Sequence, residues 1–131
     1  MSQNHSKTDI IKYRCEKSKE LLKEVEFLLQ GGFANAAISR MYYAAYHSIS
    51  ALLYSHGIET KTHKGLRQQF GNYFVKTDLI PLAQAAVFNE IYDKRQQSDY
   101  DDFMEFSIER AKEIFPDIKV LIEKVLSLTK C

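Results

Sequence analysis

The stretch that decides the fold is NAAISRMYYAAYHSISALLYS, Asn35 to Ser55. It is apolar or small almost throughout, and no Lys, Asp or Glu occurs between Phe33 and Ser55, yet it carries Arg40 and His47. A helix that is apolar on all sides is normally surrounded by other helices. The stretch therefore predicts the central helix of an all-α protein, and it raises the question of what two ionisable side chains do there.

Periodic apolar residues and capping signals predict further helices on both sides of this stretch. The expected helices run from a cap at Ser6 or Thr8 to about Gln30, from Ala34 to His56, from His63 to Val75, from Leu79 to Gln96, and from Asp102 to Leu128. Pro81 is tolerated in the first turn of the fourth helix. No segment alternates with the period of two that a half-buried strand requires. We expect an antiparallel bundle of four to five helices.

Two details of the last helix can be predicted. Ser98, Asp99 and Asp101 are candidate caps before its first residue, because short polar side chains accept hydrogen bonds from the free amides of a helix start. Pro116 lies inside the helix and removes a backbone donor, so it is expected to kink or split it.

Length and composition indicate one domain, residues 1–131, with a flexible N-terminus at residues 1–7. The chain has 131 residues, of which 45% are hydrophobic, and its 18 basic and 17 acidic residues give a net charge of +1. No global field therefore favours nucleic acid or membrane. Cys15 and Cys131 are too few for a disulfide framework, and we expect free thiols in a reducing compartment. The absence of an apolar signal core or membrane span predicts a cytoplasmic protein.

The sequence predicts no metal and no cofactor. The four histidines lack the close spacing of a helical metal site, and glycine-rich phosphate loops are absent. The four histidines are His5, His47, His56 and His63.

Helical geometry sorts the central stretch into two faces. The apolar face comprises Ile38, Met41, Tyr42, Ala45, Tyr46, Ile49, Leu52 and Leu53. The opposite stripe comprises Ala36, Arg40, Tyr43, Ala44, His47, Ala51 and Tyr54. Five short helices barely cover a central one, so a second copy of the chain is expected to cover the stripe. This predicts a homodimer with two-fold symmetry.

Arg40 and His47 lie two turns apart on the stripe, about 10 Å along the axis, with Tyr43 between them. One interpretation is a polar site, with Arg40 as a fixed cation for phosphate and His47 as a proton donor or acceptor. The other is structural, because a buried arginine needs an anion. Its candidate partners are Asp99, Glu90 and Asp93. Internal ion pairs outnumber catalytic ones, which favours the structural interpretation.

A second group of cations follows in KTHKGLR, which contains Lys61, His63, Lys64 and Arg67. These residues either contact phosphates or form a solvated loop and helix start. Four tyrosines of the central stretch, Tyr42, Tyr43, Tyr46 and Tyr54, either stack on bases or fill the core and the dimer interface.

Three motifs in order, SRMYYAAYHSISALL, THKGLRQQFGNYFVKTDLI and YDKRQQSDYDD, resemble the HEPN superfamily (higher eukaryotes and prokaryotes nucleotide-binding domain) over Ser18 to Leu128. The resemblance implies a dimeric helical bundle, often encoded beside a minimal nucleotidyltransferase as a toxin and antitoxin pair. Many members resemble metal-independent endoribonucleases, whose motif is an Arg, four to six residues and a His in a cleft across the dimer.

Arg40 and His47 satisfy that spacing, with six residues between them. In ribonuclease-like members the motif usually lies later, where this chain has Arg95 but Asp99 and Tyr100 in place of a histidine.

Two functions follow. The first is a toxin-like protein that binds RNA or a nucleotide in a dimer cleft and acts as a metal-independent endoribonuclease, with Arg40 and His47 as the catalytic pair. Its expected binding residues are Tyr43, His63, Lys64, Arg67, Arg95, Asp99 and Tyr100. The alternative is a non-catalytic module that docks a nucleotidyltransferase partner.

Overall fold

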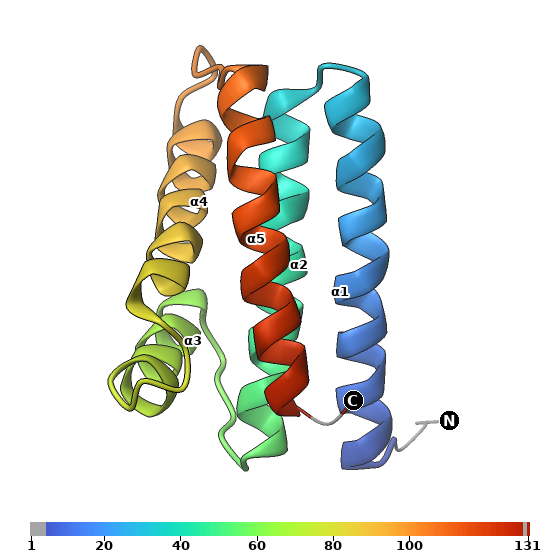
Figure 1. Ribbon diagram of the computed structural model, residues 1–131, viewed down its shortest axis with the longest axis vertical. Coiled ribbons are helices and arrows are strands. Elements are labelled where there is room, and N and C mark those ends of the chain that lie inside the picture. The colour runs from blue at the N-terminus through green and yellow to red at the C-terminus, as the bar shows by residue number, and fades with distance from the viewer. Residues whose placement is uncertain (1–4, 130) are drawn as a thin grey trace.

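The computed structural model describes residues 5–129 and 131, and all regular structure in these residues is helical. The elements are α1 (Lys7–Gln30), α2 (Ala34–Ser55), α3 (His63–Phe70), the π-helical turn η1 (Gly71–Val75), α4 (Leu82–Tyr100) and α5 (Ile108–Thr129). Four long helices lie side by side and alternate in direction, and the short α3 packs at one corner (Figure 1). The prediction of an all-α bundle is confirmed.

The central position of α2 is also confirmed. It contacts α1, α3, α4 and α5, and α5 lies directly in front of it in Figure 1. Its apolar face is buried, with Met41, Ile49 and Leu52 each 0% exposed. The small residues of the stripe, Ala44 and Ala51, are fully buried as well. Only the remainder of the stripe reaches the surface.

The start of α1 follows the predicted capping signal. Ser6 Oγ accepts a hydrogen bond from the Asp9 amide at 3.1 Å, and the Asp9 side chain reaches back to the Ser6 amide. Lys7, which the sequence places in a flexible N-terminus, is the first residue of the helix. Residues 1–4 of that segment lie outside the described residues.

The boundary between α4 and α5 differs from the prediction. Ser98 and Asp99 lie inside α4, Asp101 follows its last residue, and α5 begins only at Ile108, where Ser107 Oγ accepts from the Arg110 amide at 3.0 Å. The reason is a long-range contact, because both amide atoms of the Asn35 side chain bond the segment between the helices. Asn35 Nδ2 donates to the Met104 carbonyl and Asn35 Oδ1 accepts from the Phe106 amide, each at 2.9 Å.

Pro116 does not split α5, which continues through it to Thr129. Pro116 and Lys112 are both exposed. The Lys112 carbonyl loses its helical donor on the exposed face of α5, where water can replace the missing bond.

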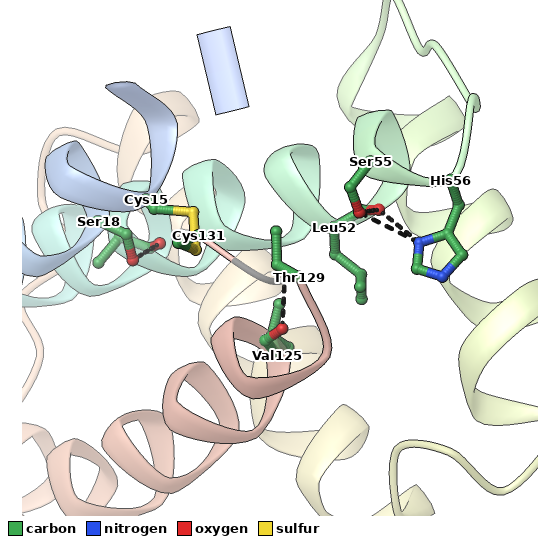
Figure 2. Close-up of a disulfide and its surroundings, with 9 residues drawn as sticks. Cys15, Ser18, Leu52, Ser55, His56, Val125, Thr129 and Cys131 are labelled. Atoms are coloured by element: carbon green, nitrogen blue, oxygen red, sulfur yellow. Dashed lines mark hydrogen bonds between the residues drawn. A yellow bond between two sulfur atoms is a disulfide. The ribbon is translucent and has the colours of Figure 1, made fainter. Parts of the chain in front are cut away.

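The prediction of two free thiols is wrong. Cys15 is buried in α1 and forms a disulfide with Cys131, with the two Cα atoms 6.2 Å apart (Figure 2). The packing of α1 beside the end of α5 brings the two residues together, although 116 positions separate them in sequence. A hydrogen bond from Ser18 Oγ to the Ala44 carbonyl, 2.7 Å long, joins α1 to α2 one turn away.

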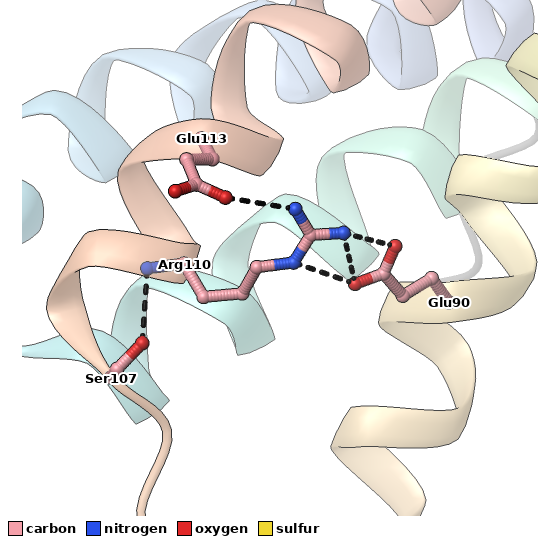
Figure 3. Close-up of polar contacts among 4 residues, drawn as sticks. All are labelled: Glu90, Ser107, Arg110 and Glu113. Atoms are coloured by element: carbon pink, nitrogen blue, oxygen red, sulfur yellow. Dashed lines mark hydrogen bonds and ion pairs between the residues drawn. The ribbon is translucent and has the colours of Figure 1, made fainter.

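An ion-pair group joins α4 to α5 on the surface. Arg110 Nη2 lies 2.8 Å from Glu90 Oε2, and Arg110 Nη1 lies 3.0 Å from Glu113 Oε2 (Figure 3). Glu90 therefore has a partner other than Arg40.

Candidate functional site

Arg40 is neither buried nor paired with any of its three expected partners. Its side chain is 50% exposed, and Nε lies 3.7 Å from Glu24 Oε2 of α1. Asp99 pairs with Arg95 instead. The expected pairing of Arg40 with Asp99, Glu90 or Asp93 is therefore wrong, because residue 40 faces the α1 edge of α2 and not α4.

His47 lies on the same edge of α2 and is partly buried. Burial lowers the pKa of its imidazole, and the positive charges of Lys17 and Arg14 on α1 lower it further. Within the described part of the chain, neither ring nitrogen has a hydrogen-bond partner. His47 is therefore a neutral imidazole near pH 7.

Tyr42 lies at the centre of a different polar group, where α2 meets α3 and α4. Its side chain is 0% exposed, and its hydroxyl oxygen is 2.5 Å from His63 Nδ1 at the start of α3. Burial raises the pKa of the Tyr42 hydroxyl far above its usual range. His63 Nδ1 is the one hydrogen-bond partner that the described residues offer to the Tyr42 hydroxyl, so the protonated hydroxyl donates there and neutral His63 carries its own proton on Nε2.

Arg95 of α4 completes this group. Its Nη2 donates to the Tyr43 hydroxyl at 2.6 Å, and its guanidinium carbon lies 4.8 Å and 5.1 Å from the ring centres of Tyr43 and Tyr42. Asp99 is 3.4 Å away, one turn later in α4, and the Arg95 side chain remains 21% exposed. Burial lowers the pKa of His63, and the Arg95 charge adds to this effect.

Arg67 of α3 extends the cationic surface. Its guanidinium carbon lies 3.9 Å from the ring centre of Tyr92, and its Nε is buried with no partner among the described atoms. Lys64, Arg67, Gln68 and Asn89 line a hollow of about 330 Å³ beside it. We call Tyr42, Tyr43, His63, Arg67 and Arg95 the Arg95–His63 cluster.

The structure thus brings together some of the expected site residues and separates others. Tyr43, His63 and Arg95 contact Tyr42. Asp99 joins this group through Arg95, Arg67 joins it through the ring of Tyr92 next to Tyr42, and Lys64 follows His63 in the chain. Arg40 and His47 lie one turn before and one turn after Tyr43 but face α1, next to Glu24 and to the charges of Lys17 and Arg14.

Tyr100 points into solvent and is 87% exposed. Sequence reasoning assigned Tyr42 to the core, which is correct, but missed that it holds His63. A buried tyrosine needs a partner for its hydroxyl, and that requirement is the signal that identifies such a residue.

Residues 5–129 and 131 contain no group of three or more His, Cys, Asp or Glu side chains arranged to hold a metal ion. Over the same residues, no helix is both long and apolar enough to cross a membrane.

Comparison with known proteins places the chain in a family. The family model of the HEPN domain matches residues 11–128. A UPF0332 protein of Thermotoga maritima is 30% identical over 109 residues, which are 83% of each chain. A protein of Methanocaldococcus jannaschii named "Putative toxin MJ0142" is 31% identical over 109 residues, which are 83% of this chain and 74% of the other. The chain belongs to the HEPN domain family.

Proposed function

We propose that this chain is a toxin-type HEPN protein that binds RNA at the Arg95–His63 cluster, in a cleft completed by a second copy in a homodimer. The observation that carries the proposal is the convergence of Arg95 and His63, from two different helices, on the hydroxyls of Tyr43 and Tyr42. The names of two relatives, both from Methanocaldococcus jannaschii, support the toxin part.

The donor set of the cluster suits a phosphate group. Arg95 keeps guanidinium protons in a fixed position, His63 presents an Nε2 proton, and Lys64 and Arg67 add positive charge nearby. Charged donors of this kind form the shorter and stronger hydrogen bonds to phosphate. Such contacts fix the strand without selecting its sequence. The partly exposed rings of Tyr43 and Tyr46 are available for stacking on bases.

The same geometry favours binding over cleavage at this cluster. Cleavage by the 2′-hydroxyl of RNA needs a base that takes its proton. The Nδ1 lone pair of His63 is occupied by the Tyr42 hydroxyl, and its Nε2 already carries a proton. No ring nitrogen of His63 is free to act as that base.

A second candidate function, metal-independent cleavage, rests on His47. Its imidazole is neutral near pH 7 and its nitrogens have no hydrogen-bond partner among the described residues, so one of them can accept a proton. Arg40 on the same edge of α2 is half exposed and can hold the phosphate. In this proposal, the RNA strand that is bound at the Arg95–His63 cluster also contacts His47.

The remaining candidate, docking of a nucleotidyltransferase partner, is favoured by the last residue of α4 and the turn that follows it. Tyr100 and Phe103 are 87% and 94% exposed there. Large exposed aromatic side chains are enriched at protein interfaces. This docking is compatible with RNA binding, because the turn lies outside the cluster.

Binding is tested by fluorescence anisotropy of a short single-stranded RNA in chelator. Arg95→Ala should weaken binding about tenfold, because one charged phosphate contact is lost. Lys112→Ala is the control, since it removes one positive charge from an exposed position on α5, a helix that contributes no residue to either candidate site. Equal affinities for wild type and Arg95→Ala would contradict the proposed site.

Cleavage is followed on gels in the same samples. Wild-type cleavage that disappears in both Arg40→Ala and His47→Ala would establish the second candidate. Absence of cleavage by wild type, or equal cleavage by all three proteins, would exclude it.

A further inference from the structure

A separate group of cations lies about three turns further along α2 from Tyr43, in the groove between α1 and α2. Lys7 Nζ and the guanidinium carbon of Arg14 lie 5.4 Å and 5.1 Å from the ring centre of Tyr54. Arg14 and Tyr54 also line a hollow of about 220 Å³, together with Lys61. Of the candidate residues named from the sequence, Tyr54 and Lys61 line this hollow.

Three cations of this groove are only partly balanced by nearby acidic groups. Within the described residues, Lys7, Arg14 and Lys61 have no carboxylate within ion-pair distance, and Glu59 is the one acidic residue that lines the hollow. Holding two cations near one ring, with a third lining the same hollow, leaves mutual repulsion that an anion would relieve. The charges of Arg14 and Lys17 also reach His47.

Aromatic contacts connect this groove to the Arg95–His63 cluster. The ring centre of Tyr46 lies 4.7 Å from that of His63 and 5.8 Å from that of His47. Tyr46 therefore lies between the cluster and the edge of α2 that faces Arg14. Along α2, the distance from Tyr43 to Tyr54 is about 16 Å, at 1.5 Å per residue.

We propose that Lys7, Arg14 and Lys61 form a second phosphate-binding site, which holds the backbone of an RNA strand whose other part occupies the Arg95–His63 cluster. The proposal rests on the proposed function. The ligand is the phosphodiester backbone, because the site offers charge without a set of donors and acceptors that reads a base. Only a strand long enough to span the distance between the two sites can use both.

The test compares a uridine 12-mer with a uridine trimer, by fluorescence anisotropy. The test variant is Lys7→Gln/Arg14→Gln/Lys61→Gln. The control variant is Lys12→Gln/Lys19→Gln/Lys23→Gln, which removes three charges from exposed positions roughly 120–160° around α1 from Lys7. Thermal melts followed by circular dichroism verify that both variants are folded.

The test variant should bind the 12-mer at least tenfold more weakly than the control variant does. The slope of log affinity against log salt should fall by about 2, at about 0.7 for each lost phosphate contact. Affinity for the trimer should stay unchanged, because the trimer is held by the Arg95–His63 cluster alone.

Equal binding of the 12-mer by the two variants would overturn this inference and leave the proposed function intact, provided that Arg95→Ala still weakens the trimer. If the test variant lost equal affinity for the trimer and the 12-mer, the inference would also be overturned. Such a loss would be explained by the lower overall positive charge and not by contacts that only a long strand makes. A wild type that binds neither RNA would overturn both proposals.

Discussion

The molecule contains two pairs of one arginine and one histidine, and they are built differently. Arg95 and His63 come from α4 and α3, and each is held by a tyrosine hydroxyl of α2. Arg40 and His47 both come from α2 and lie on its α1 edge. Arg40 makes a 3.7 Å ion pair with Glu24, and His47 has no hydrogen-bond partner among the described residues. Contacts with neighbouring helices therefore hold Arg95 and His63 in place, whereas Arg40 and His47 are only close in sequence.

The two pairs should therefore differ in what they contribute to stability. Tyr42 has no exposed surface, and its hydroxyl is bonded inside the protein. Removing one partner of such a bond leaves a buried polar atom without compensation. An exposed ion pair contributes little, because water and salt screen it.

The largest expected effect is that of Tyr42→Ala, which should lower the free energy of unfolding by about 3–5 kcal/mol, as for other buried aromatic residues. Tyr42→Phe keeps the packing and removes only the bond to His63, which should cost about 1–3 kcal/mol. Urea denaturation measures both, with the partly exposed Tyr54→Ala as the control. If Tyr42→Ala lowered the free energy of unfolding no more than Tyr54→Ala does, the buried group around Tyr42 would not stabilise the fold more than the exposed side of α2.

A smaller difference in the free energy of unfolding is expected between Arg95→Ala and Arg40→Ala. Arg95→Ala removes a charged donor to the Tyr43 hydroxyl and should cost about 1–3 kcal/mol. Arg40→Ala should cost less than about 1 kcal/mol. The same denaturation experiment, with Arg95→Lys to separate charge from guanidinium geometry, measures the difference. Equal costs would mean that the Tyr43 contact does not stabilise the fold.

The smallest effect is the pH dependence, which both histidines share. Burial lowers the pKa of His47 and of His63 below the ordinary 6.5. Between the lowered pKa and 6.5, the unfolded chain binds more protons than the folded one. The contribution of the two neutral histidines to the free energy of unfolding is therefore fully present above pH 6.5. It is lost as the pH falls from 6.5 through the lowered pKa.

Urea midpoints at pH 7.5, 6.5 and 5.5 measure this loss. His63→Gln and His47→Gln should each reduce the decline between pH 6.5 and 5.5. A wild type whose midpoint rises on acidification would contradict the direction given for both groups.

Helical periodicity depends on residues that are close in sequence. It therefore predicts which residues share a face of one helix. It placed Met41 and Ile49 on the buried face of α2, and it placed Arg40 and His47 together on the opposite stripe. It could not say which helix lies beside each edge, so Arg40 was paired with acidic residues of α4 when its neighbour is Glu24 of α1. The spacing of Arg40 and His47 matched a motif, but the residues that converge in space, His63 and Arg95, are 32 positions apart in the sequence.

Long-range contacts also explain the other differences. Local capping signals at Ser98 and Asp101 predicted an early start for α5, but the Asn35 side chain holds residues 104 and 106 in a non-helical segment. Nothing near Cys15 indicates that Cys131 lies beside it. That pairing follows only once α1 and α5 are packed against the same bundle.

The disulfide has a mechanical consequence. In the oxidised chain, tension applied between residue 5 and residue 131 passes along the first turns of α1 and through the two sulfur atoms, so α2, α3, α4 and α5 carry no load. A motor that pulls on the chain near residue 131 would draw Cys15 along with it and would meet α1 first, not α5. The order in which the helices are extracted therefore depends on whether the two sulfur atoms are bonded.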